Sequence, residues 1–265
     1  LLVLGIPEFK MEKRIVERRV NLMREEGVEF RTGINVGIDL PTEKLQRDYD
    51  AVLLAGGSTL ARDLNIPGRE LAGIYPAVTF LSQQNRLIAG EQIPADQIIS
   101  AKDKDVVVLG GGDTGSDCVG TSHRQGALSV HQFELLPEPP EQRRPDNPWP
   151  YWPMVMRTSS SQHEGGIRDY NILTQKFTGA AGDLQRLHAV RLDWGPPDKT
   201  GRPVMNEVPG SEFAIETQLV LLALGFISPE PNGMLADLEV RLDDRGNVAV
   251  DSNMMTNIPG VFAAG

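Results

Sequence analysis

The chain has 265 residues, 40% hydrophobic and 23% charged, and its 26 basic and 36 acidic side chains give a net charge of −10. This is an ordinary globular composition, and the acidic balance argues against a general nucleic-acid binder, which needs clustered positive charge. The longest apolar runs are far shorter than the roughly 20 residues that span a bilayer. A single cysteine, Cys118, excludes an internal disulfide framework and any four-cysteine iron–sulfur site made by this chain alone. We therefore expect a soluble, cytoplasmic protein without a membrane or nucleic-acid partner.

The first hundred residues predict two helices and two strands. Apolar residues recur at three-to-four-residue intervals over 13–26, which predicts an amphipathic helix that ends at Gly27. A half-buried strand is expected over 28–32 and a fully buried strand over 49–55. A second helix is expected over 76–87.

The middle of the chain predicts a strand, a glycine-rich turn, a helix and a second strand in direct succession. The first strand covers 105–109, the helix continues to Arg124, and the second strand covers 128–134. This order is typical of an α/β fold with a parallel sheet. The next segment, 137–153, holds seven prolines and two tryptophans, so it is expected to be a long irregular loop.

The rest of the chain predicts further strands over 184–194 and 212–224, and a hairpin-like turn within 240–250. Three apolar segments that end in small residues have weakly similar sequences: 50–57, 218–225 and 261–265. Such strand ends let a backbone approach a ligand at the carboxyl edge of a parallel sheet. The chance recurrence of buried strands explains this similarity equally well.

The glycine turn matches the dinucleotide-binding pattern GxGxxG. It reads Gly110-Gly111-Gly112-Asp113-Thr114-Gly115, follows an aliphatic strand directly, and opens a predicted helix. The first glycine of the pattern permits the tight turn, the second lets backbone approach a pyrophosphate, and the third allows close packing of helix on strand. The alternative is a glycine-rich turn in an unrelated α/β domain. We expect this turn to bind a nicotinamide dinucleotide.

Glu134 is expected to bind the adenine ribose. It ends the second strand, about 20 residues after the glycine turn, where dinucleotide-binding folds place an acidic side chain. A carboxylate accepts a hydrogen bond from the 2′-hydroxyl of NAD and repels the 2′-phosphate of NADP, which favours NADH. Alternatively Glu134 is a solvated strand-end carboxylate, and Arg143 with Arg144 in the proline-rich loop could accommodate NADPH.

Other reactive side chains give weaker signals. Asp113 and Thr114 could cap the helix or touch the cofactor, and the sequence does not separate these roles. Cys118 is expected to be a small buried side chain without a redox role. The four histidines show no metal-binding spacing, and no Gly-x-Ser-x-Gly elbow accompanies them. No metal site is predicted, and no catalytic acid, base or nucleophile is identified.

Several motifs together resemble those of the small (beta) subunit of glutamate synthases. They are Gly5-Ile6-Pro7, Ala55-Gly56-Gly57, Gly110 to Gly115 and Gly260 to Gly265, in this order along the chain. The segments Gln132 to Pro137, Asp146 to Pro150 and Arg157 to Ser161 look like the branch of bacterial and plant NADH-type enzymes. The resemblance covers essentially the whole chain.

The resemblance implies a Rossmann-like nicotinamide-binding domain, 103–227, inserted in a discontinuous FAD-binding domain made of 1–102 and 228–265. It implies hydride transfer from NAD(P)H to FAD and electron flow through iron–sulfur clusters outside this chain to a large (alpha) subunit. That subunit makes glutamate from glutamine and 2-oxoglutarate. By the same resemblance, the FAD-side residues are Gly5, Ile6, Pro7, Ala55, Gly56 and Gly265, and Ala223 and Gly225 line the nicotinamide side.

The chain departs from the pattern of this family at both ends. The first GxGxxG of the family and the acidic residue expected after Gly265 are absent, which predicts an FAD domain truncated at both ends. One rival interpretation is a related FAD- and NAD(P)H-dependent reductase with another electron acceptor. A rival of a different class is a non-catalytic dinucleotide-binding module.

Overall fold

The computed structural model describes residues 1–199, 201 and 203–264, which form two compact units. The first unit comprises Leu1–Glu17 and Asp63–Ala223, and the second comprises Arg18–Arg62 and Leu224–Gly265. Helix α1 (Lys13–Glu25) contains the boundary at Glu17. That residues 103–227 bind the nicotinamide nucleotide and that 1–102 with 228–265 bind FAD stays a prediction.

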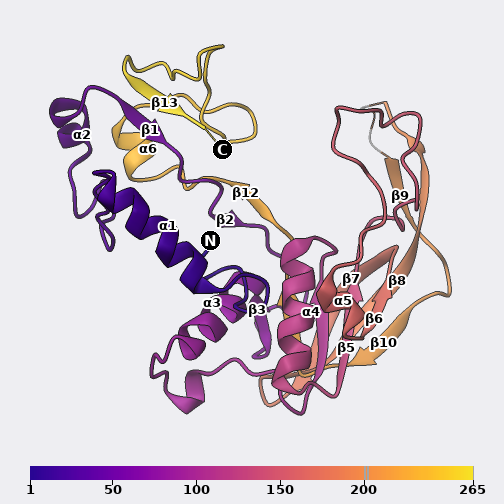
Figure 1. Cartoon of the computed structure of the whole chain (residues 1–265). Helices are drawn as coiled ribbons and strands as arrows, with labels where there is room; N and C mark the ends of the chain where they lie inside the picture. The colour runs from indigo at the N-terminus through magenta and orange to yellow at the C-terminus, as the bar shows by residue number, and fades with distance from the viewer. Residues whose placement is uncertain (200, 202, 265) are drawn as a thin grey trace. The chain divides into compact units, whose positions relative to one another are not determined.

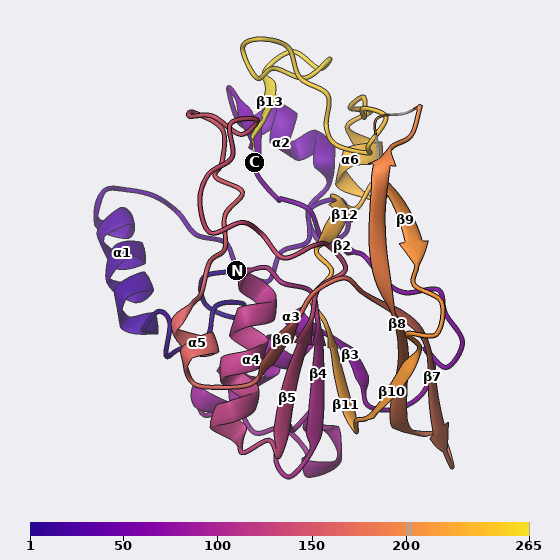
Figure 2. The same ribbon diagram turned by 90° about the vertical axis from the view of Figure 1, so that its right-hand side faces the viewer.

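A five-stranded parallel sheet forms the centre of the first unit, in the order β3-β11-β4-β5-β6. Its strands are β3 (Ile74–Pro76), β11 (Leu219–Leu222), β4 (Asp105–Leu109), β5 (Ser129–Phe133) and β6 (Ile167–Asp169). Figure 2 shows these strands side by side. β4 is the central strand, and its residues from Val106 to Val108 are 0% exposed because both faces of the sheet are covered.

Helices cover one face of this sheet and a second sheet covers the other (Figure 1). The helices α3 (Ala77–Ile88) and α4 (Asp113–Gln125) place Phe80 and Cys118 against Val106 and Val108 of β4. The first unit also contains two shorter helical segments, η1 (Ala95–Gln97) and α5 (Ser160–His163), and the start of α1 up to Glu17.

The second sheet of the first unit is antiparallel, with β8 pairing β7, β9 and β10. Its strands are β7 (Ile172–Ala180), β8 (Asp183–Pro197), β9 (Pro203–Glu207) and β10 (Phe213–Glu216). The ring of Phe213 on β10 meets the ring of Phe133 on β5 edge to face, with centroids 6.0 Å apart. This aromatic contact fixes one sheet against the other.

Among its described residues, the second unit contains two small sheets, two short helices and the part of α1 from Arg18 onward. β1 (Val52–Leu54) pairs in parallel with β13 (Val261–Ala263), and β2 (Leu60–Ala61) pairs antiparallel with β12 (Phe226–Ser228). The two short helices are α2 (Thr42–Asp48) and α6 (Met234–Asp237). The core of this unit consists of Leu54, Leu235, Leu238, Val240, Val261 and Ala263.

The predicted α/β class and several predicted elements are confirmed. The helices expected over 13–26 and 76–87 and the helix that follows the glycine turn are present, and the strand over 105–109 has the expected bounds. The segment 137–153 contains no helix or strand, as expected.

Three predicted strands are wrong in part or whole. Residues 28–32 are exposed and form no strand, because no other described strand lies beside them. The strand expected over 49–55 is shorter and forms β1. Leu53 is 62% exposed because its side chain lies on the face opposite that of Leu54, which packs in the core of this unit. The strand expected over 212–224 is two strands, since Thr217 turns its hydroxyl back onto the carbonyls of Asp105 and Leu219.

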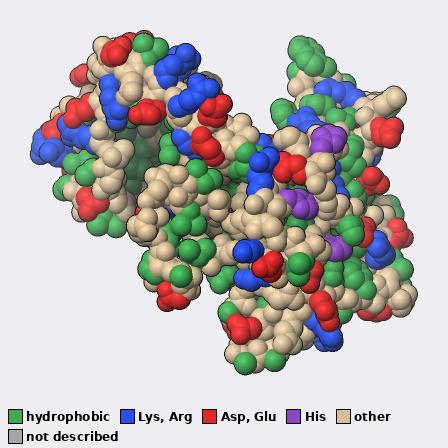
Figure 3. Space-filling view, turned by 60° about the horizontal axis from the view of Figure 1, so that its bottom comes forward, with side chains coloured by type: hydrophobic (Ala, Val, Ile, Leu, Met, Phe, Trp, Pro, Cys, Tyr) green, Lys and Arg blue, Asp and Glu red, His purple; other side chains and the backbone are tan. Residues whose placement is uncertain are grey.

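The surface carries both signs of charge. Acidic and basic side chains are interspersed over the face shown in Figure 3. No helix in the described part of the chain has the length and apolar character that a bilayer span requires. Within the same residues, no group of three His, Cys, Asp or Glu side chains has an arrangement that could hold a metal ion.

Candidate functional site

The glycine turn lies at the carboxyl edge of the parallel sheet, between the ends of three strands. Gly110 follows β4, and its N–H donates to the carbonyl of Phe133 at the end of β5, 2.9 Å away. A Cβ at Gly110 would stand 2.3 Å from the carbonyl oxygen of Ala223, at the end of β11, and its φ is +123°. Only glycine fits both the conformation and the space. The turn therefore brings Gly110 and Ala223, two predicted site residues, into contact.

The amino end of α4 is open for an anion. Gly112 is the N-cap residue and provides no side-chain cap. The N–H groups of Asp113, Thr114 and Gly115 meet no acceptor within the part of the chain that the structure describes. Nothing lies within 4 Å of the position a Cβ at Gly112 would take. Unpaired N–H groups and the helix dipole favour a phosphate at this position.

Gly115 allows α4 to pack tightly on β4. A Cβ at this position would lie 2.2 Å from the carbonyl oxygen of Gly110, a contact that real side chains do not make. The third glycine of the pattern thus has the packing role that the sequence predicts for it.

Glu134 lies directly over the glycine turn. A Cβ at Gly111 would stand 2.1 Å from Oε2 of Glu134, so the carboxylate occupies the space that a side chain at Gly111 would need. The backbone of Glu134 is held from both sides: its N–H donates to Asp169 at 2.9 Å, and its carbonyl accepts from Ile172 at 3.1 Å. A half-buried carboxylate therefore faces the turn from the end of β5.

Gln132 supports the turn and was not among the predicted site residues. Its side chain is 2% exposed, and Nε2 donates to the carbonyl of Gly110 at 2.9 Å. Its Oε1 accepts from Nε2 of Gln162 at 2.9 Å. Gln132 alternates with Val130 on a face of β5 that is expected to be buried, and a polar residue there is the sequence signal, because buried amides are conventionally hydrogen-bonded.

Asp117 lies one helical turn beyond Asp113 and faces the amino-terminal segment. Its Oδ1 is 3.8 Å from Nζ of Lys10, and its side chain is 15% exposed. Burial raises the pKa of Asp117 to about 6, the Lys10 and Lys13 ammonium groups oppose this shift, and Asp113 adds to it. Because the folded-state pKa lies above the unfolded value of 3.8, Asp117 favours folding at low pH, and this contribution is lost as the pH rises through about 6.

Asp117→Asn is therefore expected to gain stability relative to the native chain as the pH rises. We expect the difference in unfolding free energy between the two proteins to change by about 1 kcal/mol between pH 4 and pH 7.5, a value reduced for partial solvent screening. Urea unfolding at both pH values measures this difference. A difference that does not change with pH would contradict the raised pKa.

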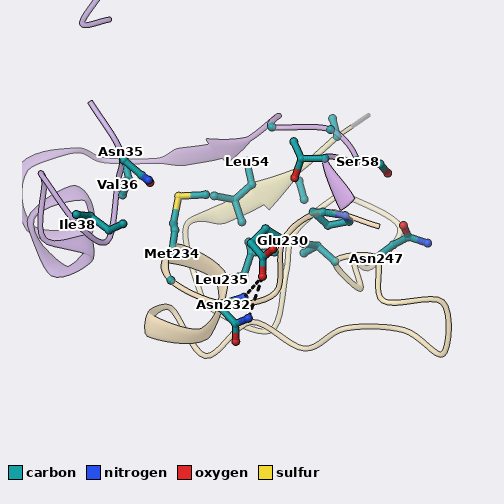
Figure 4. Close-up of a pocket in the computed structure, with 18 of the residues that line it drawn as sticks. Asn35, Val36, Ile38, Leu54, Ser58, Glu230, Asn232, Met234, Leu235 and Asn247 are labelled. Carbon is teal, nitrogen blue, oxygen red and sulfur yellow. Dashed lines mark hydrogen bonds between the residues drawn. The ribbon is translucent and has the colours of Figure 1, made fainter. Parts of the chain in front are cut away.

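The second unit holds a large pocket at the carboxyl ends of β1 and β13 (Figure 4). Its volume is about 1100 Å³, slightly above the usual range for small-molecule and cofactor sites. Its apolar lining includes Val36, Ile38, Leu54, Met234 and Leu235, and its polar lining includes Asn35, Ser58, Glu230, Asn232 and Asn247. Gly56, Gly57, Ala263 and Ala264 also line it, and such small residues let a ligand approach the strand ends closely.

Glu230 and Asn232 form a small hydrogen-bonded group at one side of this pocket (Figure 4). The carboxylate of Glu230 accepts from the backbone N–H of Asn232 at 3.2 Å and from its Nδ2 at 2.9 Å. Asn35, Asn232 and Asn247 come from three separate segments, so no local motif marks them as neighbours. Of the residues predicted for the FAD side, Gly56 lines the pocket, Ala55 immediately precedes it, and Gly265 lies outside the described residues.

The other residues predicted for the FAD side lie in the first unit. Gly5, Ile6 and Pro7 form a turn in which the N–H of Gly5 donates to the carbonyl of Leu1 at 2.7 Å. Asn85 on α3 holds this turn, since its Nδ2 donates to the carbonyls of Leu4 and Ile6 at 2.7 and 3.0 Å.

Two further predicted residues have distinct positions. Gly225 belongs to the second unit, where its carbonyl accepts from the N–H of Arg62 at 3.0 Å. Cys118 is 0% exposed, and burial raises the pKa of its thiol, which confirms a small buried side chain.

The sequence profile of the pyridine nucleotide-disulphide oxidoreductases matches residues 10–146 and 197–265. The chain therefore belongs to the pyridine nucleotide-disulphide oxidoreductase family. The glycine turn, Glu134 and all the residues given above for the large pocket lie within the matched segments.

Within this family the chain is most informatively compared with glutamate synthases. It is 49% identical over 268 residues to the "Glutamate synthase [NADPH] small chain" of Mycobacterium tuberculosis (strain ATCC 25618 / H37Rv), an alignment that covers 100% of this chain and 54% of the relative. It is 43% identical to the "Glutamate synthase [NADH]" of Schizosaccharomyces pombe, again over the whole chain but over 13% of that relative. The chain thus spans about half the length of the bacterial small chain. The resemblance to glutamate synthase small subunits is confirmed.

Solved structures support the fold. The structure "Mycobacterium tuberculosis FprA in complex with NADPH" superposes with a TM-score of 0.70 at 16% identity, covering 100% of this chain and 68% of that one. The thioredoxin reductase of T. acidophilum gives a TM-score of 0.52 at 21% identity, covering 81% of this chain and 56% of that one. The predicted Rossmann-like fold is confirmed.

Proposed function

We propose that this chain carries the nicotinamide site, and part of the flavin site, of a reductase that supplies electrons for glutamate synthesis. The single observation that supports it most strongly is the glycine turn at the carboxyl end of β4, with free N–H groups at the start of α4 and the carboxylate of Glu134 over Gly111. The match of the whole of this chain to parts of proteins named glutamate synthase supports glutamate synthesis as the reaction served. Glutamine and 2-oxoglutarate, as the substrates of that reaction, follow from the resemblance.

In this proposal each part of the first site binds a different part of NAD(P)H. The turn from Gly110 to Gly115, including Asp113 and Thr114, binds the pyrophosphate, and Glu134 binds the adenine ribose. Ala223 and Gly225 are assigned to the nicotinamide side on the resemblance alone. The backbone of the turn and the amino end of α4 supply N–H donors without intervening side chains. Orientation and electrostatics are the contribution of the protein, so no catalytic acid or base is required.

The pocket of the second unit fits a large dinucleotide such as FAD. Its lining combines apolar side chains, three asparagines, the carboxylates of Asp39 and Glu230, and small residues at the ends of two strands. When bound, FAD supplies the acceptor for the hydride. We assign Gly56 and Ala55 to this site, and Gly5, Ile6, Pro7 and Gly265 to the flavin side, as the resemblance implies.

The proposed partner is the large subunit of glutamate synthase, and the iron–sulfur clusters that link the two lie outside this chain. The name "small chain" in the bacterial relatives supports such a partner. A cytoplasmic location stays a prediction.

NADH is the proposed nucleotide. The names of the relatives include both NADH and NADPH, so the preference rests on Glu134. In calorimetric titrations at equal ionic strength, we expect this chain to bind NADH more tightly than NADPH. Glu134→Ala is expected to shift the ratio of the two affinities about tenfold toward NADPH, because one 2′-hydroxyl acceptor and one repulsive charge are removed.

Glu138→Ala is the matched control, since Glu138 is an exposed carboxylate four residues further along. This variant should leave the affinity ratio unchanged. A native chain that prefers NADPH would overturn the role of Glu134, and binding of neither nucleotide to a folded chain would overturn the site.

A further inference from the structure

A series of hydrogen bonds through two glutamine side chains connects α5 to the glycine turn. Nε2 of Gln162 donates to Oε1 of Gln132 at 2.9 Å, although 30 positions separate the two residues in the sequence. Nε2 of Gln132 in turn donates to the carbonyl of Gly110 at 2.9 Å. At the other end, Oε1 of Gln162 accepts from the backbone N–H of Ser159 at 2.9 Å. We name these four residues, Ser159, Gln162, Gln132 and Gly110, the amide relay.

The two ends of the amide relay fix the orientation of both amides. The N–H of Ser159 can only donate and the carbonyl of Gly110 can only accept, whereas each glutamine amide has one donor side and one acceptor side. If either amide rotated by half a turn, two oxygens or two N–H groups would face each other. Gln132 is 2% exposed, so water does not readily replace a lost partner there.

The amide relay acts on the peptide bond between Gly110 and Gly111. This bond is trans, so the N–H of Gly111 points away from the carbonyl of Gly110. Because Gln132 holds that carbonyl on one side, the N–H of Gly111 is directed to the opposite side. It meets no acceptor within the part of the chain that the structure describes. The relay therefore fixes the direction of a free N–H donor in the proposed pyrophosphate site.

A second contact joins α5 to the amino end of α4, and the two helices lie side by side (Figure 2). The hydroxyl groups of Ser159 and Ser116 are hydrogen-bonded, and Ser116 is 4% exposed. Ser116 belongs to the first turn of α4, where its N–H donates to the carbonyl of Gly112 at 3.0 Å. Ser159 is the N-cap residue of α5, and Gln162 bonds its N–H as in a capping box. α5 is thus held against both the turn and α4.

We propose that Gln162 is a positioning residue for the nicotinamide nucleotide. It orients the amide of Gln132, which fixes the peptide plane between Gly110 and Gly111 and with it one N–H donor for the pyrophosphate. This inference rests on the proposed function. Gln162 lies outside the glycine-rich pattern and outside the segments that the family profile matches, so neither assigns it a role.

The test uses the full-length small chain and its reduction of ferricyanide by NADH. Gln162→Leu nearly keeps the size of the side chain and removes both of its hydrogen bonds. This variant is expected to raise the KM for NADH about tenfold and to change kcat less than about twofold, because a donor to the pyrophosphate serves the ground state and the transition state alike. Calorimetric titration with NADH should show the same rise in Kd.

Gln125→Leu is the matched control. Gln125 lies at the carboxyl end of α4, where its Nε2 donates to Oε1 of Gln84 and its Oε1 accepts from the N–H of Ala101, both at 2.7 Å. It makes the same two kinds of hydrogen bond as Gln162, at the end of α4 that is opposite the glycine turn. Urea unfolding should show a similar loss of stability in the two variants, whereas KM and Kd should stay unchanged in Gln125→Leu.

Gln162→Glu tests the direction of the amide relay. The carboxylate keeps the length of the side chain and still accepts from the N–H of Ser159, because glutamate serves in capping boxes as glutamine does. It offers no donor to Oε1 of Gln132, so two oxygens face each other. We expect a rise in the Kd for NADH at least as large as in Gln162→Leu, in a variant whose α5 keeps its cap.

A double-mutant cycle shows whether Gln162 acts through Gln132. Gln132→Leu alone is expected to raise the Kd for NADH about tenfold, because it removes the donor to the carbonyl of Gly110. Adding Gln162→Leu should raise the Kd by no more than about a further twofold, since the relay is already broken. Losses that multiply independently would show that Gln162 acts by another route and would overturn the proposal.

The remaining outcomes separate this proposal from the proposed function. A native small chain that binds neither NADH nor NADPH would overturn the proposed function itself. Native binding with a Kd that changes less than about threefold in the folded Gln162→Leu and Gln162→Glu variants would overturn the relay alone. An equal loss of affinity in Gln125→Leu would also overturn it, by showing that binding follows the general stability of α4.

Discussion

Gly112→Asp is expected to weaken NADH binding about a hundredfold while leaving the fold intact, equivalent to about 3 kcal/mol of binding free energy. The φ of Gly112 is −78°, and nothing lies within 4 Å of its Cβ position, so an aspartate fits without strain. Its carboxylate would occupy the N–H groups at the start of α4 and repel the pyrophosphate. Calorimetry measures the affinity, and thermal unfolding checks the fold.

Gly112→Asn shows how much of the loss of NADH binding comes from the charge of the aspartate and how much from its size. Asparagine also caps helices and has nearly the same shape, so it should weaken binding less than aspartate does. Equal losses in both variants would show that steric exclusion dominates. Unchanged affinity in a folded Gly112→Asp variant would rule out this turn as the pyrophosphate site.

Gly115→Ala is expected to lower the free energy of unfolding by about 3 kcal/mol, the upper part of the range for overpacked interiors. A Cβ at Gly115 would lie 2.2 Å from the carbonyl oxygen of Gly110 and 2.9 Å from Nε2 of Gln132. The backbone atom cannot rotate away, so α4 must move off β4. This cost exceeds the roughly 1 kcal/mol that alanine gains over glycine within a helix. Urea unfolding measures the difference.

Gly112→Ala is the matched control for this effect. It makes the same chemical change three residues earlier in the same turn, at a position with open space around the added carbon. Its free energy of unfolding should stay within about 0.5 kcal/mol of the native value. Equal stability of the two alanine variants would show that α4 does not approach β4 as closely as described.

The central βαβ unit could be predicted from sequence because its signals are local. The valines of β4 are buried on both faces, and this pattern differs from that of an amphipathic helix or an exposed strand. Glycines at the turn and after α4 mark where the helix begins and ends. Gly126, with φ +87°, ends α4 as a left-handed C-cap.

Strand burial in the second unit could not be predicted, because it depends on neighbours that a local pattern does not show. Residues 28–32 alternate between apolar and polar types, yet they have no strand partner among the described residues. β1 has an apolar sequence, but only one face of it is covered, so Leu54 packs in the core while Leu53 stays exposed.

The proposed nicotinamide site could be predicted from sequence, whereas the pocket of the second unit could not. The turn from Gly110 to Gly115 is a contiguous motif, and Glu134 follows at a fixed spacing, so sequence was enough to nominate them. Asn35 and Asn247 line one pocket although 247 − 35 = 212 positions separate them. No periodicity or motif connects such residues, and only the folded chain brings them together.

The buried cysteine makes this chain well suited to site-specific labelling. Cys118 is the single thiol of the sequence, it is 0% exposed, and burial raises its pKa, so the reactive thiolate form is suppressed in the folded state. A cysteine introduced at an exposed position, such as that of Trp149, would therefore react selectively with a fluorophore. In the native chain, modification of Cys118 would instead report the opening of α4 from the sheet.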